Sequence, residues 1–71
     1  MALPLQVLEK ALNTRVEIAL KDRRHIAGTL VGFDEHMNLV VSDAEERTSK
    51  GASKVGTVVL RGSSIVSIHP Q

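Results

Sequence analysis

The chain has 71 residues, of which 42% are hydrophobic and one is aromatic; nine Lys and Arg stand against eight Asp and Glu, for a formal charge of +1. Residues 1–71 are expected to form one domain without disulfides or a metal site, because there is no Cys and the three His lack ligand spacing. No apolar run approaches the ~20 residues of a membrane span, so we expect a soluble, cytoplasmic protein with no membrane contact and no cofactor.

The first element is predicted to be a short amphipathic helix over about residues 4–13. Pro4 suits the first turn of a helix, and Leu5, Leu8 and Leu12 follow at intervals of three and four residues. This spacing places the three leucines on one side of the helix, where they can pack against the rest of the domain.

Five strands are predicted between residues 15 and 68. The first alternates apolar and polar residues from position 16 and ends at a polar turn over 21–24. In the second, 25–33, Gly28 and Gly32 indicate bends or close backbone approach. The third is predicted at 37–41, a loop at 45–54, the fourth and fifth strands at 55–60 and 64–68, and a fraying end at 69–71. One helix before five short strands predicts a small, strongly bent antiparallel sheet, either SH3-like or oligonucleotide-binding in shape.

The last two strands are expected to pair with another subunit. They hold six β-branched apolar residues and no internal proline, a composition that makes an uncovered strand edge adhesive: Val55, Val58, Val59, Ile65, Val66 and Ile68. Pairing between subunits would cover these edges and enlarge a small core. If the contact repeats head to tail and closes, the product is a ring.

Two stretches far apart in the chain contain the side chains needed to hold one unpaired base. His36 and Arg61 offer flat surfaces for stacking, and Asn38 offers a carboxamide that can read the edge of a base. A second basic feature, at Lys21, Arg23 and Arg24, is equally well explained as a solvated turn.

The residues around these positions resemble the two sequence motifs of the Sm-like (Lsm) proteins in their archaeal form. The first motif corresponds to residues 28–41, GTLVGFDEHMNLVV, and the second to residues 59–65, VLRGSSI. The resemblance covers almost the whole chain. It implies the Sm fold, in which the fourth and fifth strands join subunits into a ring, usually of seven, that binds single-stranded, uridine-rich RNA.

Carried over to this sequence, the resemblance implies a role for each residue of the two motifs. His36 and Arg61 would sandwich a base, Asn38 would hydrogen-bond its edge, and Gly62 would let the backbone approach closely. Because a carboxamide can match uracil in one orientation and cytosine in the other, selectivity requires a neighbour that fixes the amide. Asp34 is the candidate for that positioning role, as a partner of Asn38 or of Arg61.

Residues next to these positions could make additional contacts with the base. Ser63 and Ser64 stand where many relatives carry Asn or Asp, so a side-chain clamp from this turn would be weaker, with Ser63 as the possible contact. Met37 is a further possible contact, but packing is the favoured role for Met37 and also for Phe33.

The leading functional hypothesis is a non-catalytic, homo-oligomeric ring that binds RNA as a chaperone or scaffold in RNA processing and turnover, with RNA-processing proteins as possible partners. The alternative is a protein-assembly ring in which RNA binding is secondary. An enzyme is the weakest hypothesis, because the chain has no Cys nucleophile, no serine triad with supporting spacing and no phosphate-binding glycine loop.

Overall fold

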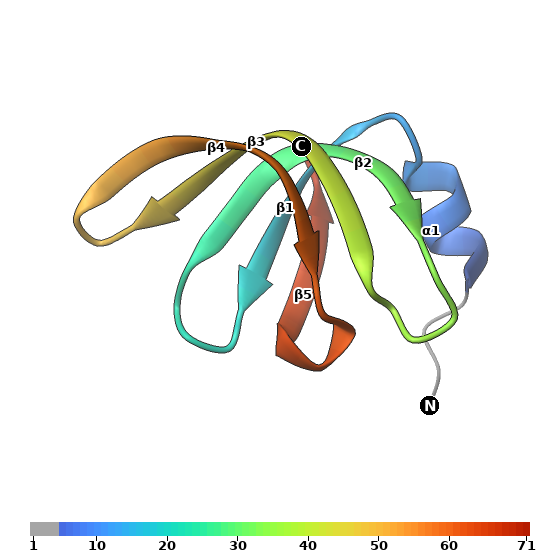
Figure 1. Cartoon of the computed structure of the whole chain (residues 1–71). Helices are drawn as coiled ribbons and strands as arrows, with labels where there is room; N and C mark the ends of the chain where they lie inside the picture. Colours follow the sequence, from blue (N-terminus) through green and yellow to red (C-terminus); the bar gives the residue numbers. More distant parts are fainter. Residues whose placement is uncertain (1–4) are drawn as a thin grey trace.

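The computed structural model describes residues 5–71 and places one helix before a five-stranded antiparallel sheet (Figure 1). The elements are α1 (Leu5–Ala11), β1 (Arg15–Leu20), β2 (His25–Phe33), β3 (Leu39–Thr48), β4 (Gly51–Leu60) and β5 (Ile65–Pro70), with a 3₁₀ turn at Gly62–Ser64. The strand order is β4-β3-β2-β1-β5. The sequence therefore predicted the element types and their order correctly.

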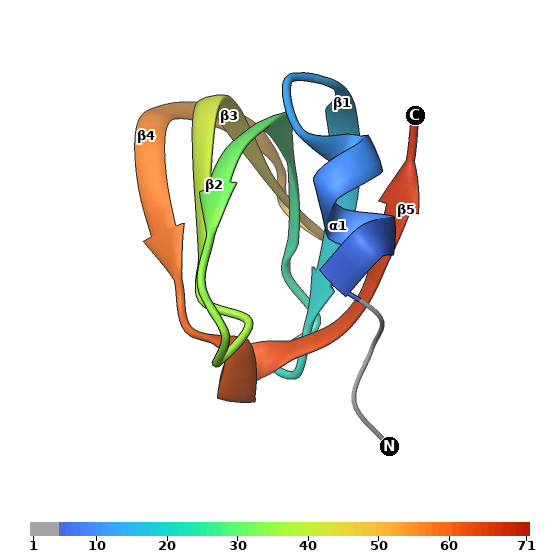
Figure 2. The same cartoon turned by 90° about the vertical axis from the view of Figure 1, so that its right-hand side faces the viewer.

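The core lies on the inner face of the curled sheet. The alternating residues Val16, Ile18 and Leu20 of β1 are buried there, and Leu8 of α1 packs into the same core. Figure 2 shows the sheet curling from β4 to β5, with α1 beside β1 and β5. None of the buried residues in the described part of the chain is polar, so the domain is held together by aliphatic packing and the strand ladder.

The bend of β2 requires a residue without a side chain at Gly28. The register between β2 and β3 shifts between Ala27 and Thr29, and a Cβ atom at residue 28 would lie 2.6 Å from Cγ1 of Val41 and 2.9 Å from the backbone oxygen of Ser42. The prediction that this glycine marks a close backbone approach is confirmed.

The predicted loop at residues 45–54 is wrong. β3 continues to Thr48 and β4 begins at Gly51, so the segment forms a hairpin in which Glu45 pairs with Lys54. The hairpin extends away from α1 and the core (Figure 1), which explains the missing apolar pattern that misled the prediction. Its strands depend on backbone pairing and on outward-facing ion pairs such as Arg47 with Glu45, at 2.9 Å.

Both ends of the chain also differ from the sequence prediction. The helix ends at Ala11, where the hydroxyl of Thr14 donates to the Ala11 carbonyl, and the proposed start at Pro4 lies outside the described residues. At the other end, residues 69 and 70 belong to β5 and are not frayed, because His69 pairs with Glu17 of β1. Local sequence did not reveal this pairing because its partner strand is some 50 residues away.

β4 and β5 form the two edges of the sheet, and three of their valines are exposed. Val59 is 70% exposed, Val66 is 64% exposed and Val55 is 40% exposed. An open hollow of about 500 Å³ with an apolar lining lies between α1 and β5. Within residues 5–71, no helix has the length and apolar character required to cross a membrane.

Candidate nucleic-acid interface

The two candidate stretches meet at one end of the sheet, where the β2–β3 turn contacts the turn between β4 and β5 (Figure 2). Gly62 makes this contact possible. A Cβ atom at residue 62 would overlap the backbone oxygen of His36 and lie 3.0 Å from the backbone carbon of Met37. The structure thus gives Gly62 a role in bringing the turns together, and a direct contact of Gly62 with a base stays a prediction.

Asp34 organises the β2–β3 turn through its carboxylate. Oδ1 accepts hydrogen bonds from the backbone N–H groups of His36 (2.9 Å) and Asn38 (3.0 Å), and Oδ2 accepts one from Nδ2 of Asn38 (2.9 Å). The side-chain hydrogen bond from Asn38 is the largest cause that lowers the pKa of Asp34 below its ordinary value of 3.8, because it stabilises the charged form. Asp34 therefore holds the turn as a carboxylate at neutral pH.

The carboxamide of Asn38 is held at both ends. Nδ2 donates to Asp34, and Oδ1 accepts from the backbone N–H of Gly62 at 2.9 Å. Rotating the amide by 180° would place its oxygen against the carboxylate and its NH₂ group against an N–H, so only one orientation satisfies both neighbours. Since a carboxamide has two donors and two lone pairs, one donor and one acceptor remain free for a ligand.

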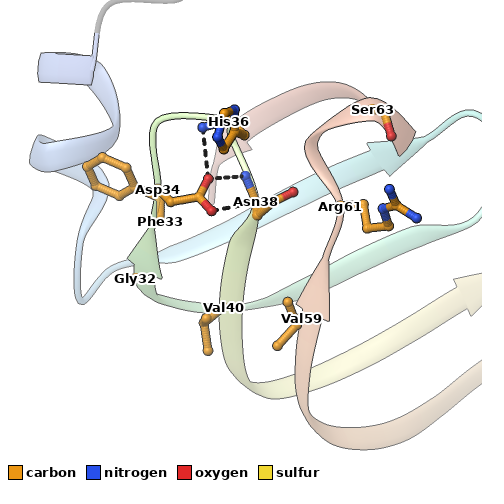
Figure 3. Close-up of a pocket in the computed structure, with 9 residues that line it drawn as sticks. All are labelled: Gly32, Phe33, Asp34, His36, Asn38, Val40, Val59, Arg61 and Ser63. Atoms are coloured by element: carbon orange, nitrogen blue, oxygen red, sulfur yellow. Dashed lines mark hydrogen bonds between the residues drawn. The ribbon is translucent and has the colours of Figure 1, made fainter.

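The two flat side chains lie on either side of Asn38 (Figure 3). The His36 side chain is 75% exposed, with Nε2 3.5 Å from Oε1 of Glu35. Arg61 is also exposed, and its guanidinium forms no ion pair with any other residue in 5–71. Both planes are therefore accessible for stacking.

These side chains border an open pocket of about 780 Å³. The lining residues come from β2, β3, β4 and the two turns: Gly32, Phe33, Asp34, His36, Asn38, Val40, Val59, Arg61 and Ser63 (Figure 3). Ser63 thus reaches the pocket. Met37 instead packs against the hydrophobic core, as does part of Phe33.

Three pocket residues, Gly32, Val40 and Val59, were missed by the sequence analysis. A usable signal existed for two of them, because side chains two positions apart on a strand share a face. Val40 follows Asn38 by two residues, and Val59 precedes Arg61 by two. For Gly32 there was no such signal, since its position in the pocket depends on the bent pairing of β2 with β3.

The basic cluster at residues 21–24 is partly neutralised. Arg24 contacts Asp22 at 2.7 Å and Glu46 at 2.9 Å, so its charge is shared with two carboxylates. Lys21 and Arg23 are exposed in the turn. Elsewhere in residues 5–71, no cluster of three His, Asp or Glu side chains is suited to hold a metal ion.

Comparisons with known proteins assign this fold and its pocket to one family. The LSM domain family model matches residues 6–70, and the chain belongs to this family. A protein from Methanosarcina barkeri, provisionally named snRNP Sm-like protein, is 47% identical over 68 residues, which cover 94% of each chain.

Solved structures agree with this family assignment. The SmAP1 heptamer of P. aerophilum has a TM-score of 0.92 and 35% identity, and the match covers 100% of this chain and 96% of that chain. The Sm protein of Pyrococcus abyssii, solved in complex with a uridine heptamer, has a TM-score of 0.90 and 33% identity, with 97% and 99% covered.

Proposed function

We propose that this chain assembles into a ring that binds single-stranded, uridine-rich RNA and catalyses no reaction on it. In this proposal the ring acts as a chaperone or scaffold during RNA processing and turnover. The observation that carries the proposal is the doubly anchored carboxamide of Asn38, which has one free donor and one free acceptor in a fixed order.

Uracil is the base that fits this order. Its N3–H can donate to Oδ1 of Asn38 while its O4 accepts from Nδ2, and the base lies between His36 and Arg61. Cytosine presents the opposite order, an acceptor at N3 and a donor at N4. If its sugar points the same way as that of uridine, the N4 donor faces the Nδ2 donor of Asn38 and the N3 acceptor faces Oδ1. The P. abyssii structure with a uridine heptamer supports this assignment.

Assembly is proposed to occur by pairing of β4 of one subunit with β5 of the next. Each chain has one free edge of each kind, so the contact is head to tail and repeats until the rotation closes. Val55 and Val66 are exposed on these two edge strands, and covering a valine is worth about 1.5–3 kcal/mol when burial is complete. Seven subunits are proposed from the likeness to the P. aerophilum heptamer.

Repetition of the pocket makes a ring a better RNA ligand than a single chain. Stacking one base is worth roughly 1–3 kcal/mol, which gives weak binding alone. When one strand reaches several identical pockets, each later contact is intramolecular, and the total affinity rises by about two to four orders of magnitude. A chain with a formal charge of +1 can then bind RNA without a strong basic field.

The experiment compares oligo(U), oligo(C) and oligo(A) of equal length by fluorescence anisotropy, with native mass spectrometry on the same samples. The expected result is a ring that prefers oligo(U), and an Asn38→Ala variant that assembles but no longer separates oligo(U) from oligo(C). The control is Lys50→Ala, an exposed change at the tip of the β3–β4 hairpin.

Two outcomes would contradict the proposal. Equal affinity of the unmodified ring for oligo(U) and oligo(C) would refute base reading by Asn38. A ring that binds none of the three homopolymers would refute RNA binding, and would favour a function in protein assembly.

A further inference from the structure

The base pocket contains an apolar row that the reading of a uracil edge does not use. Gly32 pairs with Val40 on one side, and Val40 pairs with Val59 on the other, so the three residues form one row across β2, β3 and β4. The row lines the same pocket as Asn38, which directly precedes β3, and Arg61, which directly follows β4. Figure 3 shows Val40 and Val59 side by side below Asn38.

This row is open to a ligand. Val59 is 70% exposed, and a Cβ atom built at Gly32 would meet only Cβ of Val40, at 4.0 Å. The pocket volume of about 780 Å³ lies within the range of roughly 300–1,000 Å³ typical of sites for whole small molecules. The pocket therefore has room beyond the ring of one pyrimidine.

The orientation of Asn38 determines which edge of the base faces Gly32. Nδ2 lies on the β2 side, where it donates to Asp34, and Oδ1 lies on the side of Gly62. A uracil with N3–H on Oδ1 has O4 on Nδ2, so C5, the ring atom beyond C4, lies on the β2 side. The C5–C6 edge is also the only apolar edge of uracil, and apolar side chains are the usual partners of a substituent at C5.

We propose that Gly32, Val40 and Val59 form an apolar subsite for the C5 edge of the bound base, and that the space over Gly32 admits a substituent on C5. The protein then accepts 5-methyluridine and other 5-substituted uridines at least as well as uridine. This inference rests on the proposed reading of uracil by Asn38, and it assigns Gly32 as the residue that sets the size limit at C5.

The test measures binding of short RNAs that differ only at C5: oligouridine, oligo(5-methyluridine) and oligo(5-bromouridine), all with the same length and the same 2′-hydroxyls. Burial of one methyl group at the subsite is expected to strengthen binding by about two- to fourfold per occupied pocket. A lower affinity for both substituted RNAs would overturn the proposal. The same result is expected if a neighbouring subunit covers the row of Gly32, Val40 and Val59.

A variant locates the subsite. In Gly32→Val the added side chain fills the space, so the ratio of 5-methyluridine to uridine affinity is expected to fall below one. The matched control, Ala52→Val, adds carbon atoms at an exposed position of β4 outside the pocket and should leave the ratio unchanged. If Gly32→Val leaves the ratio of 5-methyluridine to uridine affinity unchanged, the assignment of Gly32 to the subsite is overturned. If this variant does not fold, binding of the three RNAs that differ at C5 to the unmodified protein decides the proposal.

The comparison of oligo(U) with oligo(C) on the same protein separates the two proposals. A preference for oligo(U) combined with rejection of 5-methyluridine refutes the apolar subsite alone. Absence of the oligo(U) preference refutes base reading by Asn38, on which the subsite depends.

Discussion

Replacing Gly62 with alanine should break the contact between the two turns. The new Cβ would overlap the backbone oxygen of His36 and lie 3.0 Å from the backbone carbon of Met37, and neither backbone atom can move without distorting the β2–β3 turn. Separation of the turns also removes the hydrogen bond from the Gly62 N–H to Asn38. Overpacking costs about 1–3 kcal/mol and a lost hydrogen bond about 1 kcal/mol, which gives a destabilisation of about 2–4 kcal/mol.

The assay is thermal unfolding followed by circular dichroism at a fixed chain concentration, because the Tm of an oligomer depends on concentration. For a domain of this size, 1 kcal/mol shifts Tm by about 4–8 °C, so Gly62→Ala should lower Tm by roughly 10–30 °C. Gly32→Ala is the matched control: its φ lies outside the left-handed region and its Cβ has free space, so its effect should stay within about 1 kcal/mol. Equal Tm values for the two variants would refute the reasoning.

Three further predictions concern charge, stacking and assembly. The pKa of Asp34 is lowered in the folded protein, so the carboxylate stabilises the turn above pH 3.8, its ordinary pKa, and this stabilisation is lost as pH falls through the folded pKa. The affinity for oligo(U) should therefore fall over the same acid range, and Asp34→Asn should abolish this pH dependence. Arg61→Ala should weaken oligo(U) binding by about 5- to 150-fold per pocket, and Arg61→Lys should not restore binding because an ammonium has no stacking plane. The control Lys50→Ala removes the same charge and should have little effect. Equal losses of affinity in Arg61→Ala and Lys50→Ala would favour a purely electrostatic role for Arg61. Val66→Glu on the β5 edge should convert the oligomer to monomers, as measured by light scattering, while Val31→Glu on the central strand β2 should leave the oligomer intact. An oligomer that persists in Val66→Glu would contradict assembly through β5.

Local patterns predicted well those parts of the fold that bury apolar side chains. The alternation at Val16, Ile18 and Leu20 gave β1, and Gly28 gave the bend of β2, because both reflect packing against the core. The outer half of the β3–β4 hairpin escaped prediction since its residues project away from the core and carry no apolar alternation. The pairing of His69 with Glu17 escaped because it joins distant parts of the chain.

The sequence by itself determined which chemical groups are present: two flat side chains at His36 and Arg61, one carboxamide at Asn38 and an acid at Asp34, in motifs that resemble one family. Only the tertiary structure decided how the carboxamide is oriented, because the Gly62 N–H that fixes its oxygen comes from a turn 24 residues away. The same holds for the apolar row beside it. Gly32 enters the pocket through the register of β2 with β3, which no local pattern contains.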